Sequence, residues 1–326
     1  MTKYSKKFCW ILIVFWLAGL MGCSSKKEEQ PLSRIEAKEK IEQILENDYD
    51  LSSVITWTGD TFWIYVPDEN PLYSIAGGKK STKPVKKKYT LQYIDSIFDN
   101  NDLKIEYDIV EATKLSSGNG MSTQYSKEFN TKYRNVTTAI SRVFFKAENP
   151  PKFIVLVVAN IKDGLKTTTT FYTEDLKKYQ AGALPPDEYT LRIQTEPSGD
   201  EAIKGDAKGT HIEYKDIDIK DFIAKQVTTR INFKFQNSDF PPDKNVADEI
   251  LDAVVKTIHA YGFEDFSSVV LTDLRANSEI TFSKKQINAI QSTLPKEKPA
   301  SAGKIITIDF SDLMKNTKPD NSQDQN

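Results

Sequence analysis

Six lysines in ten positions form the most concentrated charge in the chain: Lys79, Lys80, Lys83, Lys86, Lys87 and Lys88. Each lysine close to anionic lipid contributes about 1 kcal/mol to binding, so this run can bind anionic lipid or a cell-wall polymer. Lysine does not form the bidentate contacts with phosphate that arginine forms, which argues against recognition of individual phosphates. A solvated loop that is kept soluble by its charge is the other interpretation, and the sequence leaves both open.

No pattern in the sequence indicates catalysis. His211 and His259 are 48 positions apart, and a zinc site needs more ligands than these two. No serine lies in a Gly-x-Ser-x-Gly pattern, and no glycine-rich loop of the phosphate-binding type opens a helix. Asp216, Asp218 and Asp221 are either a weak cation site or the charged start of the following helix. We therefore predict no catalytic residue, no metal and no cofactor.

The first 23 residues have the pattern of an export signal. Three lysines precede an apolar run over residues 8–20, which is too short to cross a bilayer as a helix. The run ends in Leu20-Met21-Gly22-Cys23, which resembles the lipobox of bacterial lipoproteins. The resemblance implies that residues 1–22 are a signal peptide and that Cys23 is lipidated with palmitate-type chains. An uncleaved anchor or a plain secretory signal is the alternative.

Lipidation of Cys23 would hold the protein outside the cytoplasm on a bacterial membrane, since two or more acyl chains anchor a protein stably. Residues 23–32 are the predicted tether, and the nine residues between Cys23 and Ser33 reach at most about 30 Å. Because Cys9 would leave with the signal peptide, no free thiol would remain for catalysis or metal binding. Ser24-Ser25 lacks the acidic signal that resembles an inner-membrane retention signal in some bacteria with two membranes. Where the cell has two membranes, the periplasmic face of the outer membrane is therefore preferred.

Composition limits the class of protein. The chain has 326 residues, of which 39% are hydrophobic, and its formal net charge is −2. These values exclude a disordered chain and a protein built to bind polyanions, so we expect no nucleic-acid partner. The length suits one large domain or two to three small ones, each with its own core.

Helical and strand patterns follow one another in the same order three times. A capping box at Ser33 and Glu36 predicts a helix over residues 34–47. Two strands are predicted to follow this helix, at residues 51–57 and 61–66. Thr90 then caps a predicted helix with Leu91, Ile94, Ile97 and Phe98 inward, and residues 103–110 predict a third strand. The corresponding third strands are predicted at 211–214 and 304–310. A box at Ser283 and Gln286 begins the last helix, with Ile287 and Ile290 inward.

We expect an α+β fold of three repeated α-β-β-α-β units, each a small three-stranded sheet with two helices on one face. The units are residues 33–112, residues 123–216 with an insertion at 181–209, and residues 243–310. A linking helix is expected at 219–236 and a disordered tail at 315–326. This order resembles, in topology alone, the BON modules of bacterial envelope lipoproteins, a resemblance that implies lipid binding.

The expected function is that of a non-enzymatic lipoprotein of the bacterial cell envelope that binds a partner protein or an assembly. Its expected partners are the membrane, through the lipid on Cys23, and another envelope protein. Binding of anionic lipid or cell-wall polymer through Lys79–Lys88 is the alternative.

Overall fold

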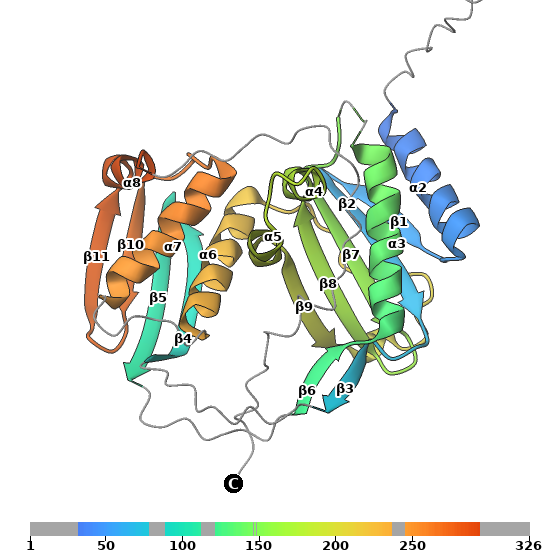
Figure 1. Cartoon of the computed structure of the whole chain (residues 1–326), viewed down its shortest axis with the longest axis horizontal. Helices are drawn as coiled ribbons and strands as arrows, with labels where there is room; N and C mark the ends of the chain where they lie inside the picture. Colours follow the sequence, from blue (N-terminus) through green and yellow to red (C-terminus); the bar gives the residue numbers. More distant parts are fainter. Residues whose placement is uncertain are drawn as a thin grey trace, which may run out of the picture.

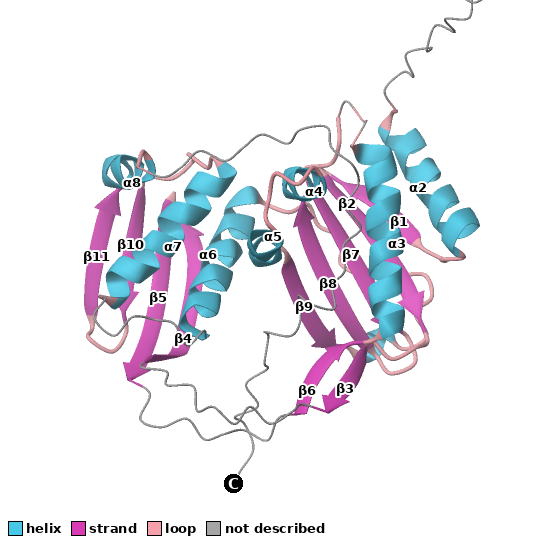
Figure 2. Ribbon diagram, viewed as in Figure 1, coloured by secondary structure: helices cyan, strands magenta, loops and turns pink. Residues whose placement is uncertain are grey.

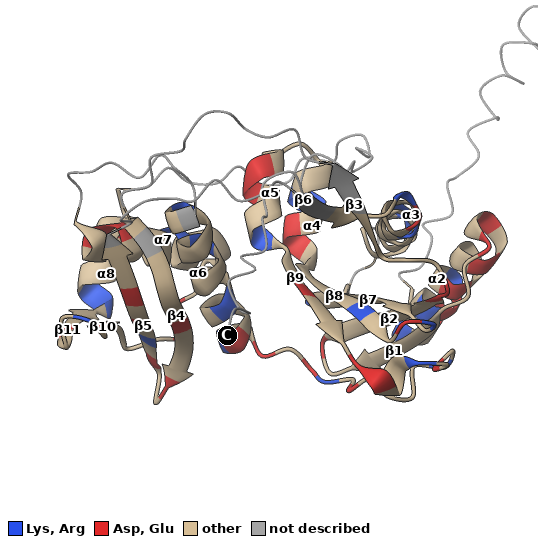
Figure 3. Cartoon of the chain, turned by 90° about the horizontal axis from the view of Figure 1, so that it is seen from below, with Lys and Arg blue, Asp and Glu red and all other residues tan. Residues whose placement is uncertain are grey.

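The structure is a computed structural model that describes residues 32–77, 89–111, 121–145, 147, 149–236 and 245–293. The described residues form a mixed α+β fold, as predicted, with two larger sheets and a two-stranded ribbon (Figures 1 and 2). The two larger sheets lie side by side. Seen along the sheets, the helices lie on the same side of both (Figure 3).

The five-stranded sheet has the strand order β1-β2-β7-β8-β9. Its strands are β1 (Val54–Thr58), β2 (Thr61–Asp68), β7 (Phe153–Asn160), β8 (Leu165–Tyr172) and β9 (Gln194–Gly199). β2 and β7 pair in parallel, and the other neighbours are antiparallel. Every residue of β7 is buried, so this nearly continuous apolar run is covered on both faces of the sheet.

One face of the five-stranded sheet packs against helices α2 (Arg34–Tyr49), α3 (Lys127–Phe144), α4 (Thr173–Gln180) and α5 (Pro186–Arg192). The predicted capping box of α2 is present, because Ser33 N donates to Glu36 Oε2 at 2.8 Å and Glu36 N to Ser33 Oγ at 3.3 Å. The buried side chains Ile41 and Leu45 of α2 join the core between the helices and the sheet.

The other face of this sheet is covered by residues 203–217, a segment of turns and irregular chain that we call the strap. It begins at the last residue of the short 3-10 helix η1 (Glu201–Ile203), and its apolar side chains pack on Trp63 and Tyr65 of β2. Trp63 Nε1 donates to the backbone oxygen of Lys215 at 2.8 Å, and Tyr65 Oη donates to that of Asp206 at 2.6 Å. The strap thus replaces a helical layer on this face.

The four-stranded sheet has the strand order β11-β10-β5-β4. Its strands are β4 (Tyr89–Asp99), β5 (Asp102–Glu111), β10 (Ser268–Asp273) and β11 (Ser278–Ser283). Helices α6 (Ile219–Gln236), α7 (Val246–Tyr261) and α8 (Lys284–Gln291) pack on one face of it. The ribbon pairs β3 (Tyr73–Gly77) with β6 (Met121–Tyr125). α6 occupies the predicted residues 219–236, and α8 begins at the predicted box, where Ser283 N donates to Gln286 Oε1 at 2.8 Å.

The two larger sheets share one connectivity. In each, the second strand of an antiparallel hairpin (β1-β2 or β4-β5) pairs in parallel with the first strand of a second hairpin (β7-β8 or β10-β11). A helix precedes each second hairpin, α3 or α7, and another follows it, α4 or α8. The same succession of hairpin, helix, hairpin and helix therefore occurs in both larger sheets.

The helix predicted to begin at Thr90 is wrong, because residues 89–99 are strand β4. The pairing of β4 with β5 shifts between Leu91 and Tyr93, which marks a β-bulge. A bulge adds one residue to one strand, so inward side chains on its two sides are three positions apart instead of two. Leu91 and Ile94 have this spacing of three, which is also the spacing of side chains on one face of a helix.

The strand predicted at residues 211–214 is also wrong, because these residues belong to the strap. The strand that pairs with β8 is β9, which lies inside the predicted insertion at 181–209 together with α5 and η1. Three separate α-β-β-α-β units are not confirmed, since β1-β2 and β4-β5 come from the first predicted unit but lie in different sheets. Ile290, predicted to face inward, is 39% exposed.

Several predicted features lie outside the described residues: the signal peptide and most of the tether, the strand at 304–310 and the tail at 315–326. Among the helices that the structure describes, none has both the length and the apolar character that a membrane span requires.

Candidate functional site

The residues that the sequence singled out for binding lie outside the described residues. These are the lipidation candidate Cys23 and the six lysines Lys79, Lys80, Lys83, Lys86, Lys87 and Lys88. The lysines follow β3, in the ribbon, and precede β4, in the four-stranded sheet. The basic run therefore belongs to the connection between two sheets rather than to a loop within one unit.

The acidic cluster near α6 is not a site for one cation, because its members have separate partners. Asp216 Oδ1 accepts from Asp60 N at 3.0 Å and from Thr61 Oγ1 at 2.7 Å, while Asp218 Oδ1 accepts from Lys220 N at 2.6 Å. Asp221 lies in the first turn of α6, as the second interpretation predicted. Across the described part of the chain, no three His, Cys, Asp or Glu side chains are grouped so as to hold a metal ion.

His211 belongs to a hydrogen-bonded turn at the start of the strap. The buried carboxylate of Asp206 accepts from the backbone amides of Thr210 at 3.0 Å and His211 at 2.9 Å, and the His211 ring lies 3.2 Å from it. Burial raises the pKa of Asp206, but these hydrogen bonds outweigh it and lower the pKa from 3.8 to about 2. His259 lies in the last turn of α7.

We expect the strap to stabilise the protein less in acid. Because the pKa of Asp206 is lower in the folded chain than in the unfolded one, its contribution is complete above about pH 4 and decreases as the pH falls towards 2. The variant Asp206→Asn should lower the free energy of unfolding by about 2 kcal/mol at pH 5 but by only about 1 kcal/mol at pH 2.5. Urea unfolding of both chains measures this difference, and an equal loss at both pH values would contradict it.

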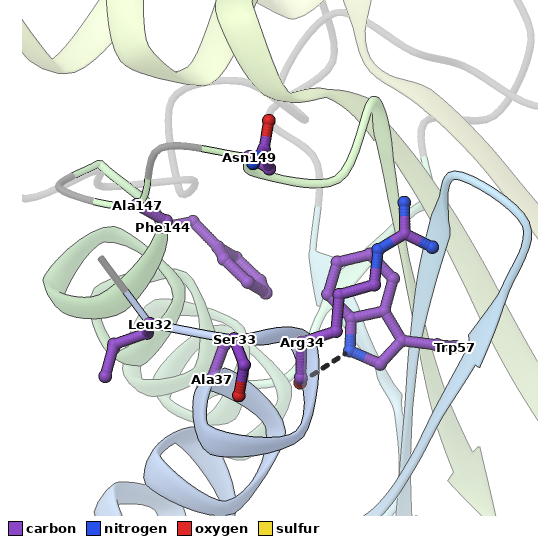
Figure 4. Close-up of a pocket in the computed structure, with 8 residues that line it drawn as sticks. All are labelled: Leu32, Ser33, Arg34, Ala37, Trp57, Phe144, Ala147 and Asn149. Carbon is purple, nitrogen blue, oxygen red and sulfur yellow. Dashed lines mark hydrogen bonds between the residues drawn. The ribbon is translucent and has the colours of Figure 1, made fainter. Parts of the chain in front are cut away.

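A hollow of about 350 Å³ lies between the start of α2 and the end of α3 (Figure 4). Arg34 stands at its rim, with its guanidinium 4.7 Å from the centre of the Trp57 ring. That guanidinium donates to the backbone oxygen of Gly59 at 2.8 Å and to Asp60 Oδ1 at 2.9 Å, and Trp57 Nε1 donates to the backbone oxygen of Arg34 at 3.1 Å. Arg34 is thus engaged in holding α2 against the β1-β2 turn, and both polar and apolar residues line the hollow.

A broader accessible surface is the face of the four-stranded sheet that points away from α6, α7 and α8, which we call the open face (Figure 3). Leu103, Ile105 and Tyr107 of β5 are buried beneath the helices. Because successive side chains of a strand point to opposite faces, Lys104 and Glu106 lie on the open face.

The strand register arranges the open face in rows. Ile97 of β4, Lys104 of β5, Val270 of β10 and Thr281 of β11 form one row. Carboxylates dominate the next row, which contains Asp95, Glu106, Thr272 and Glu279. Tyr93, opposite Asp108, begins a third row. Ile97 is 52% exposed and Tyr93 is 45% exposed, so two large apolar side chains are accessible among acidic ones.

The sequence did not predict this surface, because Tyr93 and Ile97 fall within the helix that was expected to begin at Thr90. Residues 93–99 read Tyr-Ile-Asp-Ser-Ile-Phe-Asp, which does not alternate apolar and polar residues with the period of two that is typical of a strand. The residue types therefore gave no local signal for this face of β4. Comparison of the chain with protein-family models, curated proteins and solved structures finds no match.

Proposed function

We propose that this chain is a non-enzymatic, membrane-anchored lipoprotein of the bacterial cell envelope and that it binds a partner protein through the open face. The observation that supports a partner protein is the pair of exposed apolar side chains, Tyr93 and Ile97, beside a row of carboxylates. Protein interfaces commonly place aromatic and aliphatic side chains at the centre and charged ones at the rim.

The charges on the open face specify the chemistry of the partner. In the rows above, Lys104 is the one basic side chain, against Asp95, Glu106 and Glu279, while Asp108 forms an ion pair with Arg275. Such a surface repels nucleic acid and anionic lipid, and it attracts a protein surface that carries lysine or arginine. We therefore propose a partner with a basic rim around an apolar centre.

The membrane anchor rests on the resemblance of Leu20-Met21-Gly22-Cys23 to a lipobox. With the lipid on Cys23, the short tether keeps the folded body near the bilayer, so a partner in the same membrane layer is within reach. We propose the periplasmic face of the outer membrane where the cell has two membranes. In the Cys23→Ser variant, the added hydrocarbon mass and the sedimentation with membranes should both be lost.

Photo-crosslinking of the full chain in its native membrane tests the partner. A photoreactive phenylalanine at position 93 or 97 should give the same discrete adduct with one protein. The matched position is Ile35, an exposed isoleucine on α2 away from the open face, and it should give no such adduct. Equal adducts at all three positions, or none at 93 and 97, would exclude the open face.

The binding constant provides the quantitative prediction. Ile97→Glu places a charge in the centre of the proposed interface, so binding of the crosslinked partner should weaken about 30-fold, equivalent to about 2 kcal/mol. Ile35→Glu makes the same chemical change elsewhere and should leave the binding constant unchanged.

Binding of anionic lipid or cell-wall polymer through Lys79–Lys88 is the alternative, supported by a basic run in a chain of net charge −2. It would appear as co-sedimentation with vesicles of anionic lipid that is lost when all six lysines are replaced by glutamine. Unchanged sedimentation of that variant would exclude the alternative and leave the partner protein.

A further inference from the structure

β11 is an outer strand of the four-stranded sheet as the described residues define it. Its side chains are exposed except for Phe282, which is half-buried. Ile280 lies opposite Leu271, on the side of the sheet that the helices cover, yet it is 44% exposed. The backbone amide and carbonyl groups on the outer side of such a strand pair readily with another strand. This edge therefore combines backbone pairing groups with accessible apolar side chains.

Two other outer strands of the larger sheets have features that hinder pairing with another molecule. β9 contains Pro197, which has no amide hydrogen to donate, and β4 has the bulge between Leu91 and Tyr93. β11 contains neither lysine nor proline, and its six residues pair with β10 without a shift of register. β11 is therefore well suited to pair with a strand of another molecule.

The residues of β11 are complementary to a second copy of the same strand. A two-fold axis perpendicular to the sheet places the two copies antiparallel, with the helices of both on one side. With Thr281 on this axis, Ile280 lies opposite Phe282 of the second copy, and this apolar contact occurs twice. With Ile280 or Phe282 on the axis, the other of the two would lie opposite a polar residue. The register centred on Thr281 is therefore the favourable one.

The charges at this edge favour the same register. Glu279 lies opposite Ser283 of the second copy, and Lys284 and Lys285 follow that serine at the start of α8. Each carboxylate thus approaches a basic stretch of the other copy, and opposite charges across a strand pair are stabilising. The two Glu279 residues are four positions apart along the paired strands, which separates them by about 13 Å. An axis through Glu279 would instead place two carboxylates directly opposite each other.

We propose that β11 pairs antiparallel with β11 of a second copy of this chain, with Thr281 on the two-fold axis, so that two four-stranded sheets form one continuous sheet. The open faces of the two copies then join into one surface, on which Tyr93 and Ile97 occur twice. A partner with two matching sites would bind such a pair more tightly than it binds a single chain. The pairing itself uses the edge of the sheet, so it does not depend on the partner protein proposed above.

Sedimentation equilibrium of the full chain in detergent gives the first test. The full chain should have the mass of two copies, and Ile280→Lys should raise the dissociation constant of the pair about 10-fold or more, because it replaces the apolar contact by a charge. Ile35→Lys makes the same change at an exposed isoleucine of α2 and should leave the dissociation constant unchanged. A full chain that has the mass of one copy at every concentration, or equal weakening by both variants, would overturn the proposal.

Single cysteines test the register. Thr281→Cys should form a disulfide between two copies under mild oxidation, because the axis brings the two residues directly opposite each other. Glu279→Cys is the control on the same face of β11, and its two copies lie about 13 Å apart, too far for a disulfide. Mass spectrometry of the linked peptides distinguishes this bond from any bond made by Cys9 or Cys23. Equal bonding at positions 279 and 281, or bonding at neither, would overturn the proposal.

Discussion

Replacing Arg192 by methionine is expected to lower the free energy of unfolding by about 3–5 kcal/mol, one of the two largest losses predicted for this chain. Arg192 lies at the end of α5 and is only 2% exposed. Its Nη1 donates to Asp175 Oδ1 at 2.8 Å, and its Nε donates to Glu188 Oε1 at 2.7 Å. Burial raises the pKa of Asp175, and the neighbouring guanidinium opposes that rise. Without Arg192, the buried carboxylate loses its main counter-charge and its hydrogen bond to the guanidinium.

The position of this ion pair, between helices of the two sheets, adds to the expected loss in the free energy of unfolding. Gln226 of α6 donates through its Nε2 to the backbone oxygen of Arg192 at 2.8 Å, and Arg230 of α6 forms an ion pair with Glu188 of α5. The Arg192 guanidinium also lies 5.5 Å from the ring centre of Tyr261, the last residue of α7. These contacts join the helices of the five-stranded sheet to those of the four-stranded sheet, so losing Arg192 loosens both.

Urea unfolding of matched variants separates the loss of the counter-charge to Asp175 from the general effect of removing an arginine. Arg275 forms an exposed ion pair with Asp108 at 3.0 Å, so Arg275→Met should cost no more than about 0.5 kcal/mol. The double variant Asp175→Leu/Arg192→Met removes the unpaired charge as well and should be more stable than Arg192→Met alone. A double variant less stable than the single one would show that the pair acts through packing instead.

The elements that the sequence predicted correctly are those whose signals are local. Ser33 and Glu36 satisfy each other's backbone amides at the start of α2, and this arrangement depends on four consecutive residues alone. The predicted box at the start of α8 is equally local, because Ser283 N donates to Gln286 Oε1 at 2.8 Å within four consecutive residues.

The elements that the sequence did not predict correctly depend on contacts with residues far away in the chain. β9 is a polar outer strand, and apart from Gln194 its side chains are exposed, so it has no apolar alternation to detect. The strap has alternating apolar residues such as Ile212 and Tyr214, but it buries them on the face of a sheet without joining a ladder. Which hairpins share a sheet is set by parallel pairing of strands about 90 residues apart in one sheet and more than 160 apart in the other.

Prediction of the candidate site was also limited by its dependence on residues that are far apart in the chain. Clusters within the sequence, such as Lys79–Lys88, are visible from residue types alone, but a surface made by several strands is not. The open face brings Ile97 beside Lys104 and Val270, residues from three strands that only the register places together. Recognising these rows requires the order and the register of the strands, which the residue types of one segment do not contain.

The strap leads to the second large prediction, at the turn between β1 and β2. Gly59 has a φ of 57°, and a Cβ atom added there would lie 2.0 Å from Asp216 Oδ2. The same carboxylate accepts through Oδ1 from Asp60 N and Thr61 Oγ1, and Thr61 Oγ1 in turn accepts from Ile217 N at 2.8 Å. Any side chain at position 59 must therefore displace the carboxylate that fixes the end of the strap.

Gly59→Ala is expected to lower the free energy of unfolding by about 3 kcal/mol, from left-handed backbone strain of about 1 kcal/mol and from the lost hydrogen bonds of Asp216. Gly205→Ala is the matched control, because Gly205 has a φ of 74° but no atom within 4 Å of an added Cβ, so its cost should be about 1 kcal/mol. Made in an Asp216→Ala background, Gly59→Ala should cost no more than Gly205→Ala does, because the clash is gone. Urea unfolding of the four variants measures each step, and an undiminished loss in the Asp216→Ala background would show that the strain of the turn, not its contact with the strap, requires glycine.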